Sequence, residues 1–217
     1  MLGECTATPR QRRRAKVVAA ILDAARAVMR EQGVAALNLN EVARRVGMRT
    51  PSLYEYFDGK MVLYDALFLL GVRLFRVRTA ALFVADLEPW ARLRAAIETY
   101  MGFAQEHPEL YQLVFERPVP GFEPSEASMA ESLAVLEDAT RAIEKLVTSG
   151  AMRPPVRVEQ SRDLIIAMMH GLTAQHMANE PQLPVGAGRF GALVPAAVAL
   201  FEAAWAVQSQ MDKENSP

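Results

Sequence analysis

Side chains that can donate hydrogen bonds crowd into one short stretch of this sequence, between residues 49 and 60. The stretch holds six of them: Arg49, Thr50, Ser52, Tyr54, Tyr56 and Lys60. On a short helix that buries Leu53 and Phe57, the first five of these donors lie near the outer face or the leading end, and Lys60 follows the helix. Such groups bind phosphate oxygens and the edges of bases. The pattern therefore favours recognition of nucleic acid over catalysis.

Local signals before this stretch predict the first of two short helices. Asn38 can cap it, and Glu41 can reach back to the Asn38 backbone amide, which is a capping-box pattern. Gly47 is expected to end the helix, because glycine adopts the left-handed conformation without steric cost. The inner face would consist of Leu39, Val42, Ala43 and Val46.

The second helix is predicted over about residues 51–56. Thr50 would be its N-cap and Pro51 its first residue, where the missing amide of proline does no harm. Two short helices around a tight turn, followed by an aromatic pair and a lysine, make up the layout of a helix-turn-helix.

Residues 17–64 resemble the DNA-binding domain of TetR (tetracycline repressor)-type transcriptional regulators. The resemblance is carried by ILDAARAVMREQG at residues 21–33, NEVARRVGM at 40–48 and PSLYEYFDGK at 51–60. Six positions agree in spacing and in type: Ala43, Gly47, Leu53, Tyr54, Phe57 and Lys60. The resemblance implies a dimeric repressor that binds palindromic operator DNA and releases it when a small molecule enters the C-terminal domain.

Two residues depart from the pattern of that family. Arg49 stands where a capping serine is commoner, and Glu55 places an acid on the recognition helix. Glu55 either accepts a hydrogen bond from a cytosine amino group or forms an ion pair within its helix or with a neighbouring one.

Positive charge is concentrated in the N-terminal part of the chain. Residues 1–60 hold 11 Lys and Arg against 6 Asp and Glu, whereas residues 61–217 hold 13 against 19. Attraction to phosphates is screened within about 8 to 10 Å, so this local excess matters more than the net charge. The basic run at residues 10–16 is predicted as a flexible arm, over residues 1–15, that lies along phosphates or enters the minor groove. A solubilising tail is the alternative.

The predicted DNA-binding residues combine this basic run with the helix-turn-helix: Arg12, Arg13, Arg14, Asn38, Arg49, Thr50, Pro51, Ser52, Tyr54, Tyr56 and Lys60.

Helical periodicity recurs along the whole chain, and the predicted fold is all-α with about nine helices. A three-helix DNA-binding domain with the helix-turn-helix is expected over residues 16–60, followed by a larger helical ligand-binding and dimerisation domain over residues 61–217. Helices are expected to about residue 33, at 60–82, from Pro89, from Pro108, at 126–149, at 158–178 and at 190–208. Two C-terminal segments, EHPELYQLVF at residues 106–115 and MMHGL at 168–172, also resemble a branch of the same family.

Composition indicates a globular protein of the reducing cytoplasm. The 217 residues are 51% hydrophobic, and a single cysteine excludes an internal disulfide framework. Asp23 and Arg26 interrupt the apolar run near the N-terminus, so a signal peptide is not expected. The sequence contains no stretch of about 18 uninterrupted apolar residues, so a membrane span is not expected either.

The last two predicted helices are apolar over most of their circumference, which favours a homodimer through an intermolecular four-helix bundle. A larger core within one chain is the alternative. The predicted dimer-interface residues are Leu164, Ile165, Met169, Leu172, Leu193, Val194, Val198, Phe201 and Trp205.

A mostly apolar effector is expected, because the middle helices supply aromatic and methionine side chains with few polar groups. The predicted ligand-binding residues are Tyr100, Met101, Phe103, Tyr111, Phe115, Met129, Met168, His170, Thr173 and His176. Core packing is the alternative role for each of them.

Enzymatic interpretations find little support in the sequence. Gly186, Gly188 and Gly191 match G-x-G-x-x-G, but no strand precedes them, so a dinucleotide site is not expected. His170 and His176 lie six residues apart, off one helical face, so no metal and no cofactor are predicted. The alternative to a DNA-binding regulator is a helical protein-interaction module whose helix-turn-helix is non-functional.

Overall fold

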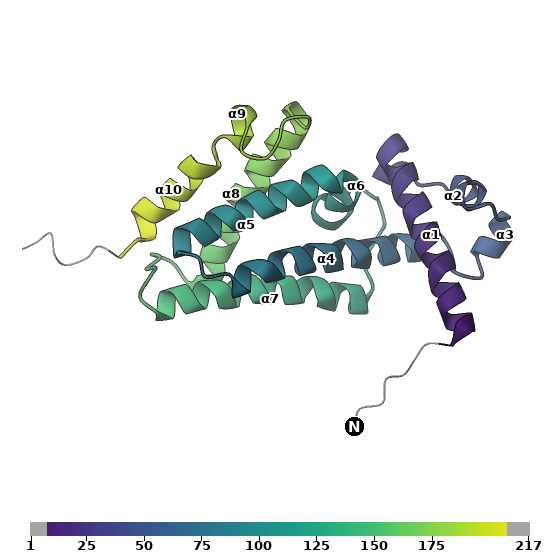
Figure 1. Ribbon diagram of the computed structural model, residues 1–217, viewed down its shortest axis with the longest axis horizontal. Coiled ribbons are helices and arrows are strands. Elements are labelled where there is room, and N and C mark those ends of the chain that lie inside the picture. The colour runs from purple at the N-terminus through teal and green to yellow at the C-terminus, as the bar shows by residue number, and fades with distance from the viewer. Residues whose placement is uncertain (1–7, 208–217) are drawn as a thin grey trace, which may run out of the picture. The chain divides into compact units, whose positions relative to one another are not determined.

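The computed structural model describes residues 8–207 of the chain, and its regular elements are helical throughout that range. Within it, the only extended pairing is an isolated bridge between Met152 and Ala206. The all-α prediction is confirmed. The elements in Figure 1 are α1 (Pro9–Gln32), η1 (Val34–Ala36), α2 (Leu39–Val46), α3 (Thr50–Leu53), α4 (Lys60–Val84), α5 (Pro89–Glu106), α6 (Pro108–Tyr111), η2 (Gln112–Glu116), α7 (Glu126–Thr148), α8 (Val158–Asn179), α9 (Gly188–Gly191) and α10 (Val194–Trp205).

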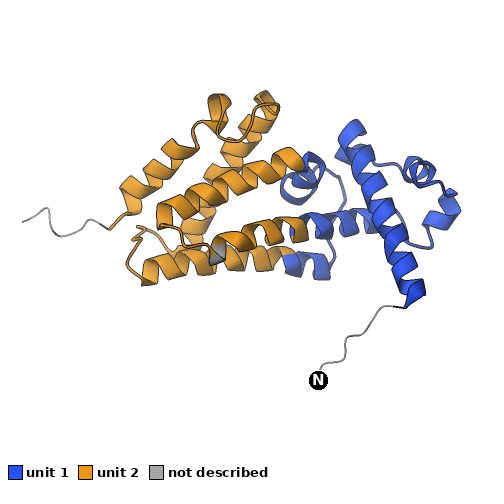
Figure 2. Ribbon diagram, in the orientation of Figure 1, with its two compact units in different colours: residues 1–72, 107–131 blue, residues 73–106, 132–217 orange. Residues whose placement is uncertain are grey.

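The chain divides into two compact units, each made of two separate stretches (Figure 2). Unit 1 comprises residues 1–72 and 107–131, and unit 2 comprises residues 73–106 and 132–217. Helices α4 and α7 each contribute residues to both units. Unit 1 therefore joins the helix-turn-helix region to α6 and η2, which follow it in the sequence by about 50 residues.

The core of unit 1 forms because each of its helices carries an apolar face at helical spacing. Ile21, Ala25 and Val28 of α1 are fully buried, as are Val42 of α2 and Leu53 of α3. The first half of α4 and the α6 region add further buried side chains: Leu63, Tyr64, Leu67, Phe68, Leu110, Tyr111 and Leu113. This packing fixes the two short helices, which are too short to be stable alone.

Helix α1 begins earlier than the sequence analysis predicted. Thr8 is its N-cap, and Thr8 and Gln11 form a reciprocal capping box. The basic run at residues 10–16 therefore lies inside the first turns of the helix, and the predicted flexible arm is wrong for residues 9–15. Residues 1–7 of that arm lie outside the described part of the chain.

Unit 2 is built around a core shared by α5, α7, α8 and α10. Its buried members are Leu93, Ile97, Met101, Ile143, Met152, Leu172, Val194, Ala197, Val198, Phe201 and Trp205. Phe201 and Trp205 lie one helical turn apart on α10, with ring centroids 4.7 Å from each other. Apolar burial of this kind is the main stabilising contribution to a helical domain.

The last predicted helix is in fact two helices. The short α9 ends at Gly191, and α10 begins at Val194 with a proline in its first turn. Pro195 has no amide to donate to the carbonyl four residues before it, so a continuous helix is interrupted at this point. Within residues 8–207, no helix combines the length and the apolarity needed to cross a bilayer.

Candidate functional site

The first helix of the helix-turn-helix, α2, has the predicted ends. The Asn38 side chain accepts a hydrogen bond from the Asn40 amide at 2.9 Å, and Gly47 ends the helix with φ 75°. The second half of the predicted capping box is absent, since the Glu41 carboxylate turns to two arginines instead. It accepts from Arg44 and from Arg45, each at 2.7 Å. These hydrogen bonds lower the pKa of Glu41 to about 2, because they favour the ionised form.

The second helix, α3, begins one residue earlier than predicted. Arg49 occupies the N-cap position without a side-chain cap, and Thr50 is already helical. The Thr50 hydroxyl donates to Asn40 Oδ1 at 2.9 Å, so it ties α3 to α2. Thr50 therefore does not act as the cap that the sequence predicted. Its bond to a residue ten positions away holds the turn between the helices.

Side chains around α3 form an exposed polar surface. Arg49 and Pro51 are exposed, Tyr54 is 50% exposed, and Ser52 and Tyr56 are half-buried. Leu53 is fully buried beneath them and anchors the helix. The donors on this surface can reach a phosphate or a base edge from a backbone that the core holds in place.

Arg14 belongs to this surface in a way that the sequence did not indicate. Its guanidinium donates to the Glu55 backbone carbonyl at 3.2 Å and lies 4.9 Å from the centre of the Tyr56 ring. Both contacts brace the end of the recognition segment against α1. Arg12 and Arg13 are also exposed on α1. Within residues 8–207, the Glu55 carboxylate forms no ion pair, so the ion-pair interpretation of this residue gains no support.

Lys60 is engaged inside unit 1. Its ammonium donates to the Ala35 carbonyl at 3.1 Å and lies 5.5 Å from the Tyr64 ring centre. These contacts tie the start of α4 to η1, where Tyr64 also donates to the Val34 carbonyl at 2.6 Å. A DNA contact by Lys60 therefore stays a prediction, and any such contact would compete with this packing role.

The ten predicted ligand-binding residues are divided between the two units. Tyr111, Phe115 and Met129 belong to unit 1, and the other seven belong to unit 2. In unit 2, the Tyr100 hydroxyl lies 3.0 Å from His170 Nδ1, and the Tyr100 ring packs edge-on against Phe75 at 5.7 Å. Buried members of the set are Tyr100, Met101, Phe103, Tyr111, Thr173 and His176.

Two polar members of this predicted set, Thr173 and His176, form hydrogen bonds within the chain. The Thr173 hydroxyl donates to the Met169 carbonyl at 2.8 Å. His176 Nε2 lies 3.1 Å from both the Leu183 carbonyl and the Gln105 side chain, so it anchors the loop after α8. These contacts fit the packing alternative, and the ligand site stays a prediction.

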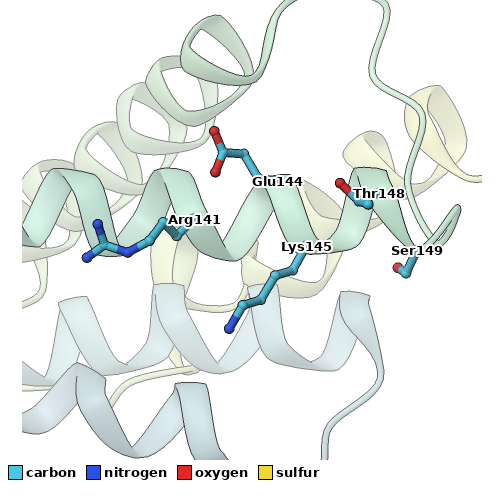
Figure 3. A pocket seen from close by; sticks show the side chains of 5 residues that line it. All are labelled: Arg141, Glu144, Lys145, Thr148 and Ser149. Carbon is cyan, nitrogen blue, oxygen red and sulfur yellow. The ribbon is translucent and has the colours of Figure 1, made fainter.

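An open groove of about 530 Å³ runs along α7 and involves none of these residues (Figure 3). Its lining side chains come from the second half of that helix and the residue after it: Arg141, Glu144, Lys145, Thr148 and Ser149. Arg141 is already paired with Asp138, and both side chains are partly exposed. Within the described residues, no group of three or more His, Cys, Asp or Glu side chains is placed to hold a metal ion.

The predicted dimer-interface residues fall into two groups. Leu172, Val194, Val198, Phe201 and Trp205 are buried in the core of unit 2, so they are not available to a second chain. The structure places these five differently from the expectation, because periodicity marks an apolar position without telling which face meets the chain's own core. Ile165 and Met169 are half-buried beside that core. Leu164 and Leu193 are exposed by 50% and 43%.

Two family models match the chain. Residues 21–67 match the model of bacterial regulatory proteins of the tetR family, and residues 93–204 match the tetracyclin repressor-like C-terminal domain. The chain belongs to the TetR family. This is a family of transcriptional regulators and not an enzyme family, and the helix-turn-helix described above lies within the first match.

Individual relatives cover between half and nine-tenths of the chain. The transcriptional activator FasR of Mycolicibacterium smegmatis is 34% identical over 110 residues, which are 50% of this chain and 48% of FasR. The chain thus matches about half the length of this relative. The crystal structure of the regulatory protein SCO4313 covers 90% of this chain and 100% of its own, with TM-score 0.69 and 27% identity. AibR in complex with isovaleryl coenzyme A and operator DNA covers 85% and 97%, with TM-score 0.64 and 18% identity.

Proposed function

We propose that this protein is a ligand-responsive transcriptional repressor that binds palindromic operator DNA as a homodimer. The observation that carries the proposal is the surface around α3, where Arg49 and Tyr54 are exposed above the buried Leu53. A helix-turn-helix used only for packing has no need of donors on its outer face. The partner, DNA, implies a cytoplasmic protein.

The two proposed functions, DNA binding and effector binding, belong to successive parts of the chain. Residues 16–60 would read the operator, and residues 61–217 would bind the effector and the second protomer. The basic first turns of α1 would add phosphate contacts that fix the register without reading sequence. Arg12 and Arg13 are suited to this role, since both are exposed on the helix that carries Arg14.

The dimer would use the faces of α8 and α10 that the core of unit 2 leaves uncovered. This apolar face consists of Leu193, just before α10, and of Ala196, Ala199, Leu200 and Ala203 on α10. On α8 it includes Leu164, Ala167 and Gly171, which are spaced by three and four residues. Small residues let helices of two protomers approach closely in a four-helix bundle. Two-fold symmetry would place two recognition helices about 34 to 36 Å apart, at successive major grooves.

The effector would be a small, mostly apolar molecule, because the side chains predicted to contact it are chiefly aromatic and sulfur-containing. The acyl chain of an acyl thioester fits this description, although coenzyme A itself is polar, and the neighbour AibR was crystallised with isovaleryl coenzyme A. Binding would act by favouring a state whose recognition helices are wrongly spaced for DNA. Thermal unfolding with isovaleryl coenzyme A, compared with coenzyme A alone, tests whether the acyl group contributes.

Activation of transcription is the second candidate, because the relative FasR is an activator. The two candidates differ in the effect of the bound protein on RNA polymerase. In vitro transcription from a template that carries the selected operator distinguishes them. Repression predicts fewer transcripts as protein is added, and activation predicts more.

Selection of double-stranded DNA from a random pool tests the whole proposal. The full chain is used at about physiological salt, where non-specific attraction is weakened. We expect enrichment of a palindrome, and we expect the double variant Arg49→Ala, Tyr54→Ala to lose it while its circular dichroism is unchanged. Lys60 is left intact, since it binds Ala35. If a folded wild-type dimer enriched no sequence, the protein-interaction alternative would replace this proposal.

A further inference from the structure

A fully buried carboxylate lies in unit 1, on a helix outside the helix-turn-helix. Glu109 of α6 has a side-chain exposure of 0% and accepts hydrogen bonds from two arginines of α1. Arg26 Nε donates to Oε1 at 2.9 Å. Arg30 donates to both oxygens, with its Nε 3.1 Å from Oε2 and a terminal nitrogen 3.0 Å from Oε1 and 2.9 Å from Oε2. Both oxygens of Glu109 are thus engaged by charged donors, the strong form of hydrogen bond.

A second bond joins α1 to His107, the residue just before α6. A terminal nitrogen of Arg26 lies 3.0 Å from His107 Nδ1. Arginine has no acceptor, so His107 must accept here through an unprotonated Nδ1. Arg26 and Arg30 are four residues apart and lie on one face of α1, which is therefore bonded to both His107 and Glu109 at the start of α6.

Helix α4 contacts α6 and η2 at a glycine. A Cβ atom built on Gly71 would lie 2.8 Å from Val114 Cγ2 and 3.4 Å from Leu110 Cβ. Only a glycine leaves room for this approach. Within unit 1, the segment 107–116 is thus fixed by polar bonds to α1 and by close packing to α4.

We infer that Glu109 is a positioning residue for DNA binding, which it serves by fixing α1 within unit 1. This inference rests on the proposed function. Arg14, at the other end of α1, bonds the Glu55 carbonyl beside the recognition segment. Movement of α1 would therefore reach the DNA-reading surface directly. Glu109, which fixes α1, lies about 50 residues beyond the helix-turn-helix, in the segment that directly follows α5.

The test compares Glu109→Gln with Glu106→Gln in the full chain. Glutamine at position 109 keeps the size but turns donor hydrogens toward the arginines, leaving a largely buried Arg26 without its carboxylate. Glu106 is a matched control, because it is also paired with an arginine, Arg78, but its side chain is 56% exposed.

Two measurements are made on both variants, amide hydrogen exchange and affinity for the selected operator. We expect Glu109→Gln to exchange at least tenfold faster in α1, with α10 unchanged, and to bind operator at least tenfold more weakly. Glu106→Gln should stay within twofold of the wild type. A general loss of stability would instead raise exchange in α10 as well. Unchanged exchange in α1, or unchanged affinity despite faster exchange, would overturn the inference.

Arg30→Met keeps the experiment decisive if Glu109→Gln fails to fold. Arg30 is 51% exposed, and its loss leaves the Arg26 bond to Glu109 intact. We expect faster amide hydrogen exchange in α1 here too, but by about threefold. Unchanged exchange in α1 of this variant would contradict the inference. If the wild-type chain binds no DNA, the proposed function fails, and hydrogen exchange alone then decides whether Glu109 fixes α1.

Discussion

Arg49 stands at the N-cap of α3 with an exposed side chain that makes no capping bond. Its guanidinium is therefore available for a bidentate contact with guanine, the commonest specific contact in the major groove. If it reads a base, Arg49→Ala should cost about 1 to 3 kcal/mol at that one position of the operator. Competition binding with single-base operator variants measures this. A uniform loss over all sequences would assign Arg49 to a phosphate, and Arg94→Ala on α5 serves as the charge control.

Tyr64 offers a test of how unit 1 is held together. Burial raises the pKa of Tyr64 to about 12, and its hydroxyl donates to the Val34 carbonyl at 2.6 Å. The neutral form is favoured in the folded state, so its contribution to stability is complete below pH about 10 and is lost as pH rises towards 12.

Tyr64→Phe should lower the free energy of unfolding by about 1 kcal/mol at pH 7, because the Val34 carbonyl loses its donor. The variant should also lack the part of the alkaline decline that Tyr64 causes between pH about 10 and 12. Urea unfolding over this range measures both effects. Tyr54→Phe is the control, since Tyr54 is 50% exposed. An identical alkaline decline in Tyr64→Phe would contradict this explanation.

Helix packing in unit 1 depends on the contact between α4 and η2 at Gly71. Alanine is the better helix former by about 1 kcal/mol, but its methyl group would lie 2.8 Å from the stiff Val114 side chain. Because overpacking costs about 1 to 3 kcal/mol, we expect Gly71→Ala to destabilise the protein by roughly 1 kcal/mol net.

Gly102→Ala on α5 is the matched control, since nothing lies within 4 Å of its built Cβ. It should stabilise the protein by about 0.5 to 1 kcal/mol through helix propensity alone. Thermal unfolding compares the two variants. Equal shifts in Tm would show that the contact at Gly71 does not limit the packing.

Assembly of the molecule can be tested at the exposed face of α10. Leu200 is 64% exposed, and a glutamate there would bury a charge in the apolar face of the proposed dimer. We expect Leu200→Glu to be a folded monomer by light scattering. It should bind operator roughly 100-fold more weakly, because two linked half-sites bind far more tightly than one. Leu133→Glu on α7, where leucine is 50% exposed, is the control and should stay dimeric. A dimeric Leu200→Glu would exclude this face.

Much of the fold and part of the candidate site could be predicted from the sequence. Asn38 and Gly47 mark the ends of α2 through bonds and dihedral angles that involve only neighbouring residues. The helical period of apolar residues likewise predicts an all-α chain. Prolines and glycines predict most of the remaining helix boundaries. The exception is Pro195, in the first turn of α10, because the periodicity there predicts one continuous helix from residue 190.

Contacts between distant residues were decided only by the tertiary structure. The sequence did not indicate the bond from Arg14 to Glu55, 41 positions apart, or from Arg26 to Glu109, 83 positions apart. A glutamate among apolar Leu110, Tyr111 and Leu113 was the available sign of a buried acid, but not of its partner. Similarly, periodicity placed Phe201, which is buried, and Leu193, which is exposed, in one apolar stripe of the last predicted helix. Local signals act through neighbouring residues and therefore determine the helices, whereas the partner of a side chain depends on how those helices pack.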